Sequence, residues 1–468
     1  MTVDTPKTGP DTVSPKHWLW FEQALLDTGW ARSVRIGIRD GLIDSIERGV
    51  AAAPGYQVHA TGLPGLANLH SHAFQRGMAG LAEVRGPSQD SFWTWRETMY
   101  RFVDRFRPDE VAAIAAMAFA EMLEGGFTRV AEFHYLHHDI DGRPYADPGE
   151  MAEAIAAAAD QTGIGLTLLP VFYAHSGFGG APPVEAQRRF VNDLDGFRRL
   201  LQDSGRAISS LPDAVIGVAP HSLRAVTADE LRAVCAMSDG PIHIHIAEQV
   251  REVEDCLAWS GARPVDLLFD TVEVDRRWCL IHATHTSPGE LRRMAASGAV
   301  AGLCPITEAN LGDGVFPAAD YLAAGGAWGV GSDSNVSISA GQELRMLEYS
   351  QRLVHRSRNV MADPAGGSSG RAMVRAALAG GAQATGTDIV VGLSVGQVAD
   401  IIALAARDGS SPPQEDRALD HWIFVSADRP VEAVWRRGRQ VVGHGRHIAR
   451  QSIVRRYASV LSRLLDDA

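Results

Sequence analysis

Lysine is almost absent from this chain of 468 residues. It occurs only at Lys7 and Lys16, so nearly all of the 44 basic side chains are arginine. This absence excludes Schiff-base catalysis by an internal lysine, a phosphate-binding loop of the Walker A type, and a metal pair bridged by a carbamylated lysine. An active site in this chain must therefore be built from other groups.

Cysteine is also scarce, and long apolar runs and basic clusters are missing. Cys235, Cys256, Cys279 and Cys304 are widely spaced without a CxxC pair, so we expect buried thiols rather than disulfides or a thiolate zinc site. No window reaches the roughly 18 apolar residues that span a bilayer, and Met1–Lys16 lacks the apolar segment of a signal peptide. We therefore expect a cytoplasmic protein without a membrane partner. The net charge of −12, without a basic run, also disfavours nucleic acid as a partner.

What the chain does contain is a regular alternation of strand-like and helical segments. It is 46% hydrophobic and 21% charged, which suits a large core. Eight apolar segments read as strands: Leu63–Leu69, Thr128–Phe133, Gly165–Phe172, Ala214–Ala219, Ile242–Ile246, Cys279–Ile281, Ala299–Leu303 and Ala327–Gly331. The helical patterns between them include Asp109–Glu124, Glu185–Leu201, Ala228–Met237 and Gln342–Arg356. Eight such strands predict an α/β fold with a (β/α)8 TIM-like barrel.

The two ends of the chain have strand patterns of a different kind. Arg32–Ile46 reads as a hairpin around an Asp-Gly turn, while Ala399–Ala405, Val431–Trp435 and Gly438–Gly443 read as short strands and turns. Both ends could form one small β-sandwich domain. The expected domains are therefore residues 1–63 for the N-terminal part of the β-sandwich, 64–390 for the barrel, and 391–468 for the C-terminal part of the β-sandwich with a terminal helix.

Polar side chains collect where the predicted strands end. In strand order they are His70 and His72, His221, His245 and Glu248, His282, and Asp333. In a barrel these positions converge on the C-terminal face, where active sites lie. His70 and His72 point the same way on an extended segment, so both can hold one ion. A third imidazole from across the barrel and a carboxylate would leave room for water.

Single histidines are weak evidence, because many are packed, hydrogen-bonded groups. His243 forms a second HxH with His245 but lies one pleat deeper, so we expect it to be a core residue or to support a ligand. His134, His137 and His138 follow the second strand and are expected to be loop or substrate-facing groups, solvated by default. The metal hypothesis therefore rests on the conjunction of several strand ends.

The pattern of HxH, HxxE, a single His and Ser-Asp-Ser resembles the amidohydrolase superfamily, specifically its single-metal deaminase branch. Leu63–His70 and Val391–Asp400 resemble that superfamily's barrel start and its return to the β-sandwich, so the resemblance covers nearly the whole chain. More specific motifs resemble the members that convert N-formimino-L-glutamate to N-formyl-L-glutamate and ammonia in histidine degradation: His70–Gly77, Trp93–Arg96, Glu132–Tyr135 and Pro220–Arg224.

This resemblance implies one Zn²⁺ per chain, with Fe or Mn also compatible with the N/O donors. The implied ligands are His70, His72, His245 and Asp333. The implied catalytic groups are Glu248 as proton shuttle, His282 in contact with the attacking water, and Asp333. The residues implied to bind the dicarboxylate substrate are Gln75, Arg96, Tyr135, His221 and Arg224. The family also implies a homodimer.

Alternative functions remain open at this point. Another deaminase or hydrolase of the same branch, acting on a nucleobase, nucleoside or chlorinated triazine, would use the same metal set. Arg96 and Arg224 disfavour this alternative, because two guanidinium groups suit a substrate with two carboxylates. Hydrolysis of an imidazolone ring also fits Glu248. A non-catalytic barrel should have lost metal ligands or Glu248, and the sequence retains all of them.

Overall fold

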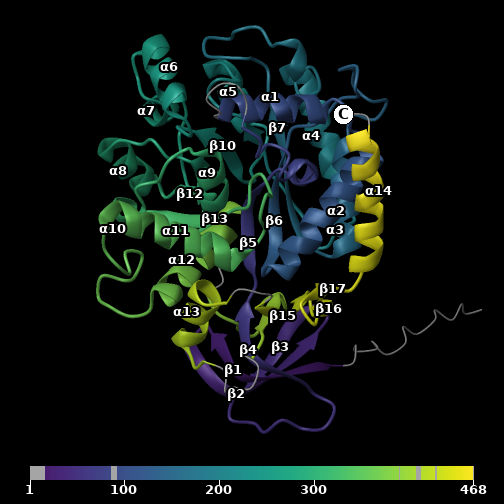
Figure 1. Ribbon diagram of the computed structural model, residues 1–468, viewed down its shortest axis with the longest axis vertical. Coiled ribbons are helices and arrows are strands. Elements are labelled where there is room, and N and C mark those ends of the chain that lie inside the picture. Colours follow the sequence, from purple (N-terminus) through teal and green to yellow (C-terminus); the bar gives the residue numbers. More distant parts are fainter. Residues whose placement is uncertain (1–15, 86–91, 389–390, 407–412, 427–429, 467–468) are drawn as a thin grey trace, which may run out of the picture.

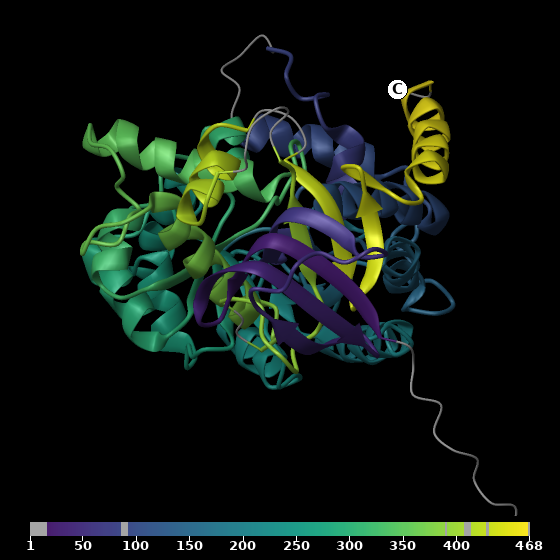
Figure 2. The same cartoon turned by 90° about the horizontal axis from the view of Figure 1, so that it is seen from below.

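The protein is described by a computed structural model that covers residues 16–85, 92–388, 391–406, 413–426 and 430–466. Segments from both chain ends form a sheet at one end of the molecule, and an α/β body rises from it (Figure 1). Seen from below, the N-terminal and C-terminal strands lie side by side across the body (Figure 2).

The terminal sheet has eight strands in the order β17-β16-β15-β14-β4-β1-β2-β3. Their bounds are β1 (His17–Leu26), β2 (Gly29–Arg39), β3 (Leu42–Glu47), β4 (Gln57–Pro64), β14 (Ile401–Leu404), β15 (Val431–Arg436), β16 (Arg439–Gly443) and β17 (Arg446–His447). β14 pairs antiparallel with β4, with Ile402 opposite Leu63, and this pairing joins the two ends of the chain. The prediction of one β domain from both ends is thus confirmed as a shared sheet. Sequence analysis missed β1.

The predicted barrel strands are present as two parallel sheets. One contains β5 (Leu66–Ser71), β6 (Phe127–His134), β7 (Gly165–Phe172) and β8 (Val215–Ile216), with β9 (Ala219–Pro220) also on β7. The other contains β10 (Ile242–Ile246), β11 (Trp278–His282), β12 (Val300–Leu303) and β13 (Ala327–Val330). The prediction of an α/β fold is confirmed. The hydrogen-bond ladder among the described residues does not close into one continuous barrel.

Both seams between the two parallel sheets are narrow and are crossed only by isolated bridges among the described residues. Ser71 bridges Asp333 at one seam, while Val218 bridges Ile242 and Ser222 bridges His245 at the other. A Cβ on Gly331 would lie 2.7 Å from the carbonyl oxygen of His70, and one on Gly217 would lie 2.4 Å from that of Pro241. Glycine therefore allows the backbones to approach closely there. The close approach at Gly217 coincides with the break of the predicted strand Ala214–Ala219 into β8 and β9.

Fourteen α-helices are described. They are α1 (Phe92–Val103), α2 (Pro108–Glu124), α3 (Glu150–Thr162), α4 (Leu194–Ala207), α5 (Ala228–Cys235), α6 (Val250–Ser260), α7 (Pro264–Thr271), α8 (Pro288–Ser297), α9 (Pro305–Leu311), α10 (Ala318–Ala323), α11 (Ala340–His355), α12 (Ser369–Ala384), α13 (Asp416–Phe424) and α14 (Arg450–Asp466). None of the helices in the described ranges is long and apolar enough to cross a membrane. α2 is buried on nearly all sides and lies beside α14 (Figure 1).

Capping side chains explain where several helices begin. Ser287 and Glu290 form a reciprocal capping box at the start of α8, and Gly298 ends that helix with a φ of +75°. The predicted helix Glu185–Leu201 was wrong at its start. Only a short 3-10 turn, Glu185–Gln187, forms there, and α4 begins after Asp193, whose carboxylate accepts a hydrogen bond from the Gly196 N–H at 2.7 Å.

A buried ionic network connects the terminal sheet to the parallel strands. Arg436, at the end of β15, donates hydrogen bonds to both carboxylate oxygens of Asp213 at 3.0 Å and also pairs with Asp400. Arg129 of β6 forms a second ion pair with Asp213, at 3.0 Å. Arg436 is only 4% exposed, so each charge in the network depends on its partners for stabilisation.

Replacing Arg436 by Met should leave Asp213 and Asp400 short of a buried cation. We expect a loss of about 3–5 kcal/mol in the free energy of unfolding, because uncompensated buried charges are costly. Arg32→Met is a control in the same sheet, since Arg32 pairs with Glu415 on the surface at 3.4 Å and should contribute about 1 kcal/mol or less. Urea unfolding monitored by circular dichroism measures both. Equal effects of the two substitutions would contradict a stabilising role for the network.

Candidate active site

Four side chains converge where the parallel strands end. His70 lies at the end of β5 and His72 follows it, His245 comes from β10, and Asp333 follows β13. The Nε2 atoms of His70 and His245 are 3.1 Å apart. Asp333 Oδ1 lies 3.3 Å from His72 Nε2 and 3.5 Å from His70 Nε2. All four side chains are buried, and the three histidines could hold one metal ion together.

These separations fit a tetrahedral metal ion. Zn–N bonds of about 2.0–2.1 Å place two ligand nitrogens about 3.3–3.4 Å apart in a tetrahedron. Hydrogen bonds also leave the correct ring nitrogens available as ligands. His72 Nδ1 lies 3.0 Å from the carbonyl oxygen of Phe133, and His245 Nδ1 lies 3.1 Å from that of His221. A proton on each Nδ1 leaves Nε2 with its lone pair.

Electrostatics support the same ligand set. Burial opposes charge on Asp333, but His70, His72 and His282 outweigh it and hold the pKa of this carboxyl well below its usual range. Burial lowers the pKa of His70 to about 3, so its imidazole is neutral, as a ligand must be. His282, Cys304 and Asp333 form a second group of potential ligands. Burial keeps the pKa of the Cys304 thiol well above its usual value, which disfavours that group because thiolate is the form that binds metal.

Backbone strain is concentrated at this site. His282 and Asp333 have φ values of 67° and 43°, and Ala247 and Ala283 also have positive φ. Left-handed conformations of non-glycine residues cost about 1–3 kcal/mol each and cluster at functional sites. The main chain of Asp333 is fixed on both sides, since its N–H donates to His70 and its carbonyl accepts from His72, each at 3.0 Å.

Glu248 and His282 stand together beside the ligand cluster. His282 Nε2 lies 3.8 Å from Glu248 Oε1 and 3.7 Å from Asp333 Oδ2, while its Nδ1 lies 3.2 Å from Glu308 Oε1. Burial alone would lower the pKa of His282, but the three carboxylates outweigh it and raise this pKa to about 10. Burial raises the pKa of Glu248 to about 7, against the opposing effects of His282 and Arg224. A carboxyl group with a pKa near neutrality is suited to proton transfer.

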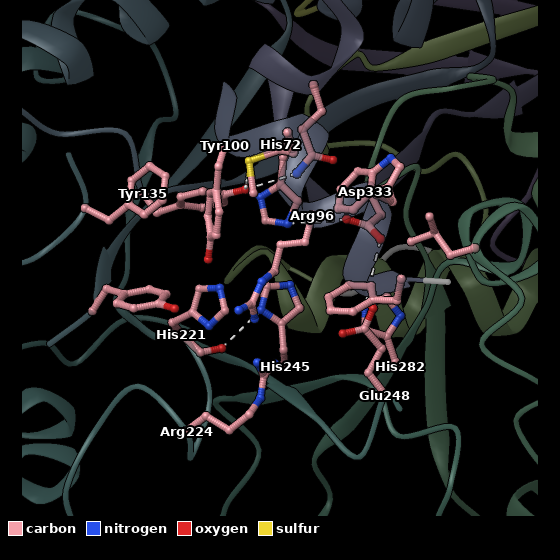
Figure 3. A pocket seen from close by; sticks show the side chains of 17 residues that line it. His72, Arg96, Tyr100, Tyr135, His221, Arg224, His245, Glu248, His282 and Asp333 are labelled. Carbon is pink, nitrogen blue, oxygen red and sulfur yellow. Dashed lines mark hydrogen bonds and ion pairs between the residues drawn. The ribbon is translucent and has the colours of Figure 1, made fainter. Parts of the chain in front are cut away.

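One pocket contains nearly all of the site residues predicted from sequence (Figure 3). Its lining includes His72, Gln75, Arg96, Tyr135, His221, Arg224, His245, Glu248, His282 and Asp333. His70 is fully buried behind it. In Figure 3, Arg224 points in from one side of the pocket and Glu248 lies on the other. The structure therefore gathers the predicted groups into one place.

The two arginines of the pocket have few anionic partners. Arg224 is 8% exposed, and its Nε lies 4.0 Å from Glu252 Oε1 without a hydrogen bond between them. Burial lowers the pKa of Arg224, but Glu252 and other acidic neighbours outweigh it, so the group stays charged. Within the described residues, no carboxylate forms an ion pair with Arg96. Two guanidinium groups are thus available to an anionic ligand.

Other histidines lie away from the pocket. His243 is fully buried, with Nε2 2.8 Å from the carbonyl oxygen of Ala384, which agrees with a core role. The prediction of solvated residues at His134, His137 and His138 was wrong, since they are 2%, 1% and 7% exposed. His137 and His138 instead bond to main-chain carbonyl groups, and none of the three lines the pocket.

Sequence analysis missed several supporting residues. Glu308 pairs with His282 and accepts a hydrogen bond from the N–H of Cys304 at 2.9 Å. Asn335 donates to the carbonyl oxygens of His72 and Asp333 at 3.1 Å each. An acidic residue five positions after a strand end, and an amide two positions after the Ser-Asp-Ser aspartate, were the available signals. α1 was also missed, and it supplies aromatic side chains to the pocket.

Comparisons with known proteins agree with this geometry. Residues 61–441 match the Amidohydrolase family, and residues 17–60 match "Formimidoylglutamate deiminase HutF, N-terminal domain". The formimidoylglutamate deiminase of Pseudomonas aeruginosa is 52% identical over 96% of this chain and 99% of its own length. A crystal structure of an amidohydrolase from Brucella melitensis has a TM-score of 0.92 and 55% identity, and the match covers 96% of this chain and 100% of that one.

A more distant solved structure shares the fold. The atrazine chlorohydrolase from Arthrobacter aurescens, complexed with zinc, has a TM-score of 0.79 and 20% identity, over 95% of this chain and 99% of that chain. Structural relatives of this fold thus bind zinc. Because the family match covers most of the chain and the Pseudomonas relative matches it nearly end to end, the chain belongs to the amidohydrolase family, and within it to the formimidoylglutamate deiminases.

Proposed function

We propose that this protein hydrolyses N-formimino-L-glutamate to N-formyl-L-glutamate and ammonia, as a zinc-dependent deiminase of histidine degradation. The observation that carries the proposal is the placement of Arg96 and Arg224 in the same pocket as the metal-ligand cluster. The identity of the Pseudomonas aeruginosa relative as a formimidoylglutamate deiminase supports it.

His70, His72, His245 and Asp333 would hold one metal ion. When bound, zinc lowers the pKa of its coordinated water from far above neutrality toward about 7 and so supplies a nucleophile at neutral pH. The four donors are three imidazoles and one carboxylate, which suit Zn²⁺ and leave Fe or Mn as alternatives. Burial lowers the pKa of His70, so its imidazole is neutral. Main-chain carbonyl groups orient the rings of His72 and His245.

Glu248 moves the protons in the proposed reaction. It takes a proton from the attacking water as the water oxygen bonds to the formimidoyl carbon, and it delivers that proton to the imino nitrogen. The remaining proton of the former water then passes from the new hydroxyl group through Glu248 to the same nitrogen. The bond between the carbon and this nitrogen breaks, ammonia leaves, and the formyl group remains on the glutamate nitrogen. His282 is held by Glu308 at 3.2 Å, so its Nε2 faces the space between Glu248 and Asp333. There it can orient the water.

Arg96 and Arg224 bind the two substrate carboxylates, and Gln75, Tyr135 and His221 contact the glutamate portion. Gln75 Nε2 donates to Tyr135 Oη at 3.0 Å, which fixes the orientation of both side chains. Burial holds the pKa of His221 well below its usual value, so it acts as a neutral hydrogen-bonding group. A neutral nucleobase would leave both guanidinium groups without a partner in a largely buried site, which disfavours the alternative deaminases.

The proposal also includes features that rest on the sequence and on family resemblance. These are a cytoplasmic location, a homodimer, a (β/α)8 TIM-like arrangement with a β-sandwich, and domains at residues 1–63, 64–390 and 391–468. The pairing of β14 with β4 supports a single domain made from the first and last of these segments. The boundary at residue 390 lies outside the described residues.

Metal removal and replacement should show one ion per chain. Chelation should abolish ammonia release, and one equivalent of Zn²⁺ should restore it, because the chain offers one neutral, oriented ligand set. Metal analysis of the restored protein measures the stoichiometry. A requirement for two tightly bound ions would overturn this assignment.

Glu248→Gln should retain zinc and substrate binding while kcat falls by about 10²–10⁴, the range typical of lost general acid–base catalysis. Steady-state kinetics and metal analysis of the same sample test this expectation. Loss of zinc from the variant would show that Glu248 is a ligand instead.

Replacing Arg96 or Arg224 by Met should cost about 2–4 kcal/mol in kcat/KM, because each loses a charge-assisted pair of hydrogen bonds. Zinc should stay bound, and Lys should rescue poorly because an ammonium group cannot form a planar fork. Arg232→Met is the control, since Arg232 pairs with Asp229 on the surface of α5. Normal turnover of N-formimino-L-glutamate by both variants would refute the carboxylate assignment.

A further inference from the structure

A second cavity adjoins the metal-site pocket on its outer side. It lies between α1, the segment after β7, and α6, and its lining includes Trp93, Arg251 and Trp259. Arg96 and Arg224 line both this cavity and the inner pocket. Trp93 lines only the outer cavity, so the two arginines stand between Trp93 and the inner pocket.

Three guanidinium groups converge on the indole ring of Trp93. The Cζ atoms of Arg96, Arg251 and Arg224 lie 5.0, 4.9 and 5.9 Å from the ring centroid. They come from three different elements, since Arg96 shares α1 with Trp93, Arg251 belongs to α6, and Arg224 lies between β9 and α5. One half-buried aromatic ring therefore connects the two proposed substrate arginines with a third cation.

The convergence needs a physical explanation because like charges repel. A guanidinium within about 6 Å of an indole centroid is attracted by the ring quadrupole, and the attraction is stronger where the pair is shielded from water. Arg251 has a carboxylate nearby, with Nε 3.5 Å from Asp255. Arg96 has a second aromatic neighbour instead, because Tyr100 lies one turn further along α1, 5.4 Å from its Cζ.

Aromatic contact also restricts where a long side chain points. A free arginine side chain has many rotamers, and a guanidinium that is already held in place loses less conformational entropy when a carboxylate binds. Arg96 and Arg224 reach the pocket from separate elements, so the backbone alone does not fix the separation of their two guanidinium groups. Their shared contact with Trp93 can fix it.

We propose that Trp93 is a positioning residue that holds Arg96 and Arg224 at the spacing needed to bind a dicarboxylate. This inference deepens the proposed function and rests on it for the identity of the substrate. In this role Trp93 does not contact the reacting atoms. Its effect passes through the two arginines and therefore depends on the carboxylates of the ligand.

The test compares Trp93→Leu and Trp93→Phe with the unmodified zinc-loaded enzyme. Trp93→Leu should raise KM for N-formimino-L-glutamate by about 5- to 30-fold, as expected for the loss of one or two cation–π contacts, with a much smaller change in kcat. Trp93→Phe keeps an aromatic face and should recover most of the loss. Trp18→Leu is the matched control, because Lys16 and Arg35 lie 4.5 Å from its ring centroid in the terminal sheet. It should change neither constant.

A double-mutant cycle separates positioning from simple packing. In an Arg96→Met background, Trp93→Leu should raise KM by less than it does alone, since part of its effect acts through Arg96. A full, additive effect would show that Trp93 only fills space and would overturn the proposal. Should Trp93→Leu fail to retain zinc, Trp93→Met, whose unbranched and flexible side chain fills irregular gaps, takes its place in the same cycle.

Binding of glutarate, measured by calorimetry, separates this inference from the proposed function. If the unmodified protein binds glutarate but does not release ammonia from N-formimino-L-glutamate, the proposed function fails. The role of Trp93 is then judged by whether Trp93→Leu weakens glutarate binding. Unchanged binding and turnover in Trp93→Leu would overturn the positioning role while leaving the function intact. A protein that binds no dicarboxylate would overturn both.

Discussion

Asp333 is the residue on which the geometry of the site depends. Its main-chain N–H and carbonyl groups form hydrogen bonds across the seam between β13 and β5, and these bonds fix the backbone at His70 and His72. The same residue adopts a left-handed conformation and places its carboxylate against the imidazoles. The strain, the narrow glycine seam and the buried charge are therefore consequences of one requirement, which is to bring a carboxylate and two histidines from opposite seam strands within reach of one ion.

The rest of the pocket is divided between proton transfer and carboxylate recognition. Glu248 and His282 lie beside the ligand cluster, while Arg96 and Arg224 stand at the boundary with the outer cavity. This arrangement suits a substrate that carries its reacting carbon at one end and two carboxylates in the remainder. The near absence of lysine is consistent with it, since arginine supplies the planar recognition of carboxylates that lysine cannot.

Local sequence patterns predicted those parts of the protein that depend on neighbouring residues. β7 and β10 have the predicted bounds, and the polar residues at the strand ends meet in one pocket. The start of α4 depends on a local cap at Asp193 that the helical pattern did not reveal. The burial of His134 and the missing closure of the strand ladder depend on contacts between distant segments. Glu308 was missed for the same reason, because its partner His282 lies on another element and no short motif reveals the contact.

The most direct test of the account is ammonia release from N-formimino-L-glutamate by zinc-loaded protein of known metal content, with identification of the second product. The account predicts metal-dependent release of one ammonia for each N-formyl-L-glutamate formed, and little turnover of a neutral nucleobase under the same conditions. Preferential deamination of the nucleobase, or ammonia release that persists after complete removal of the metal, would contradict it.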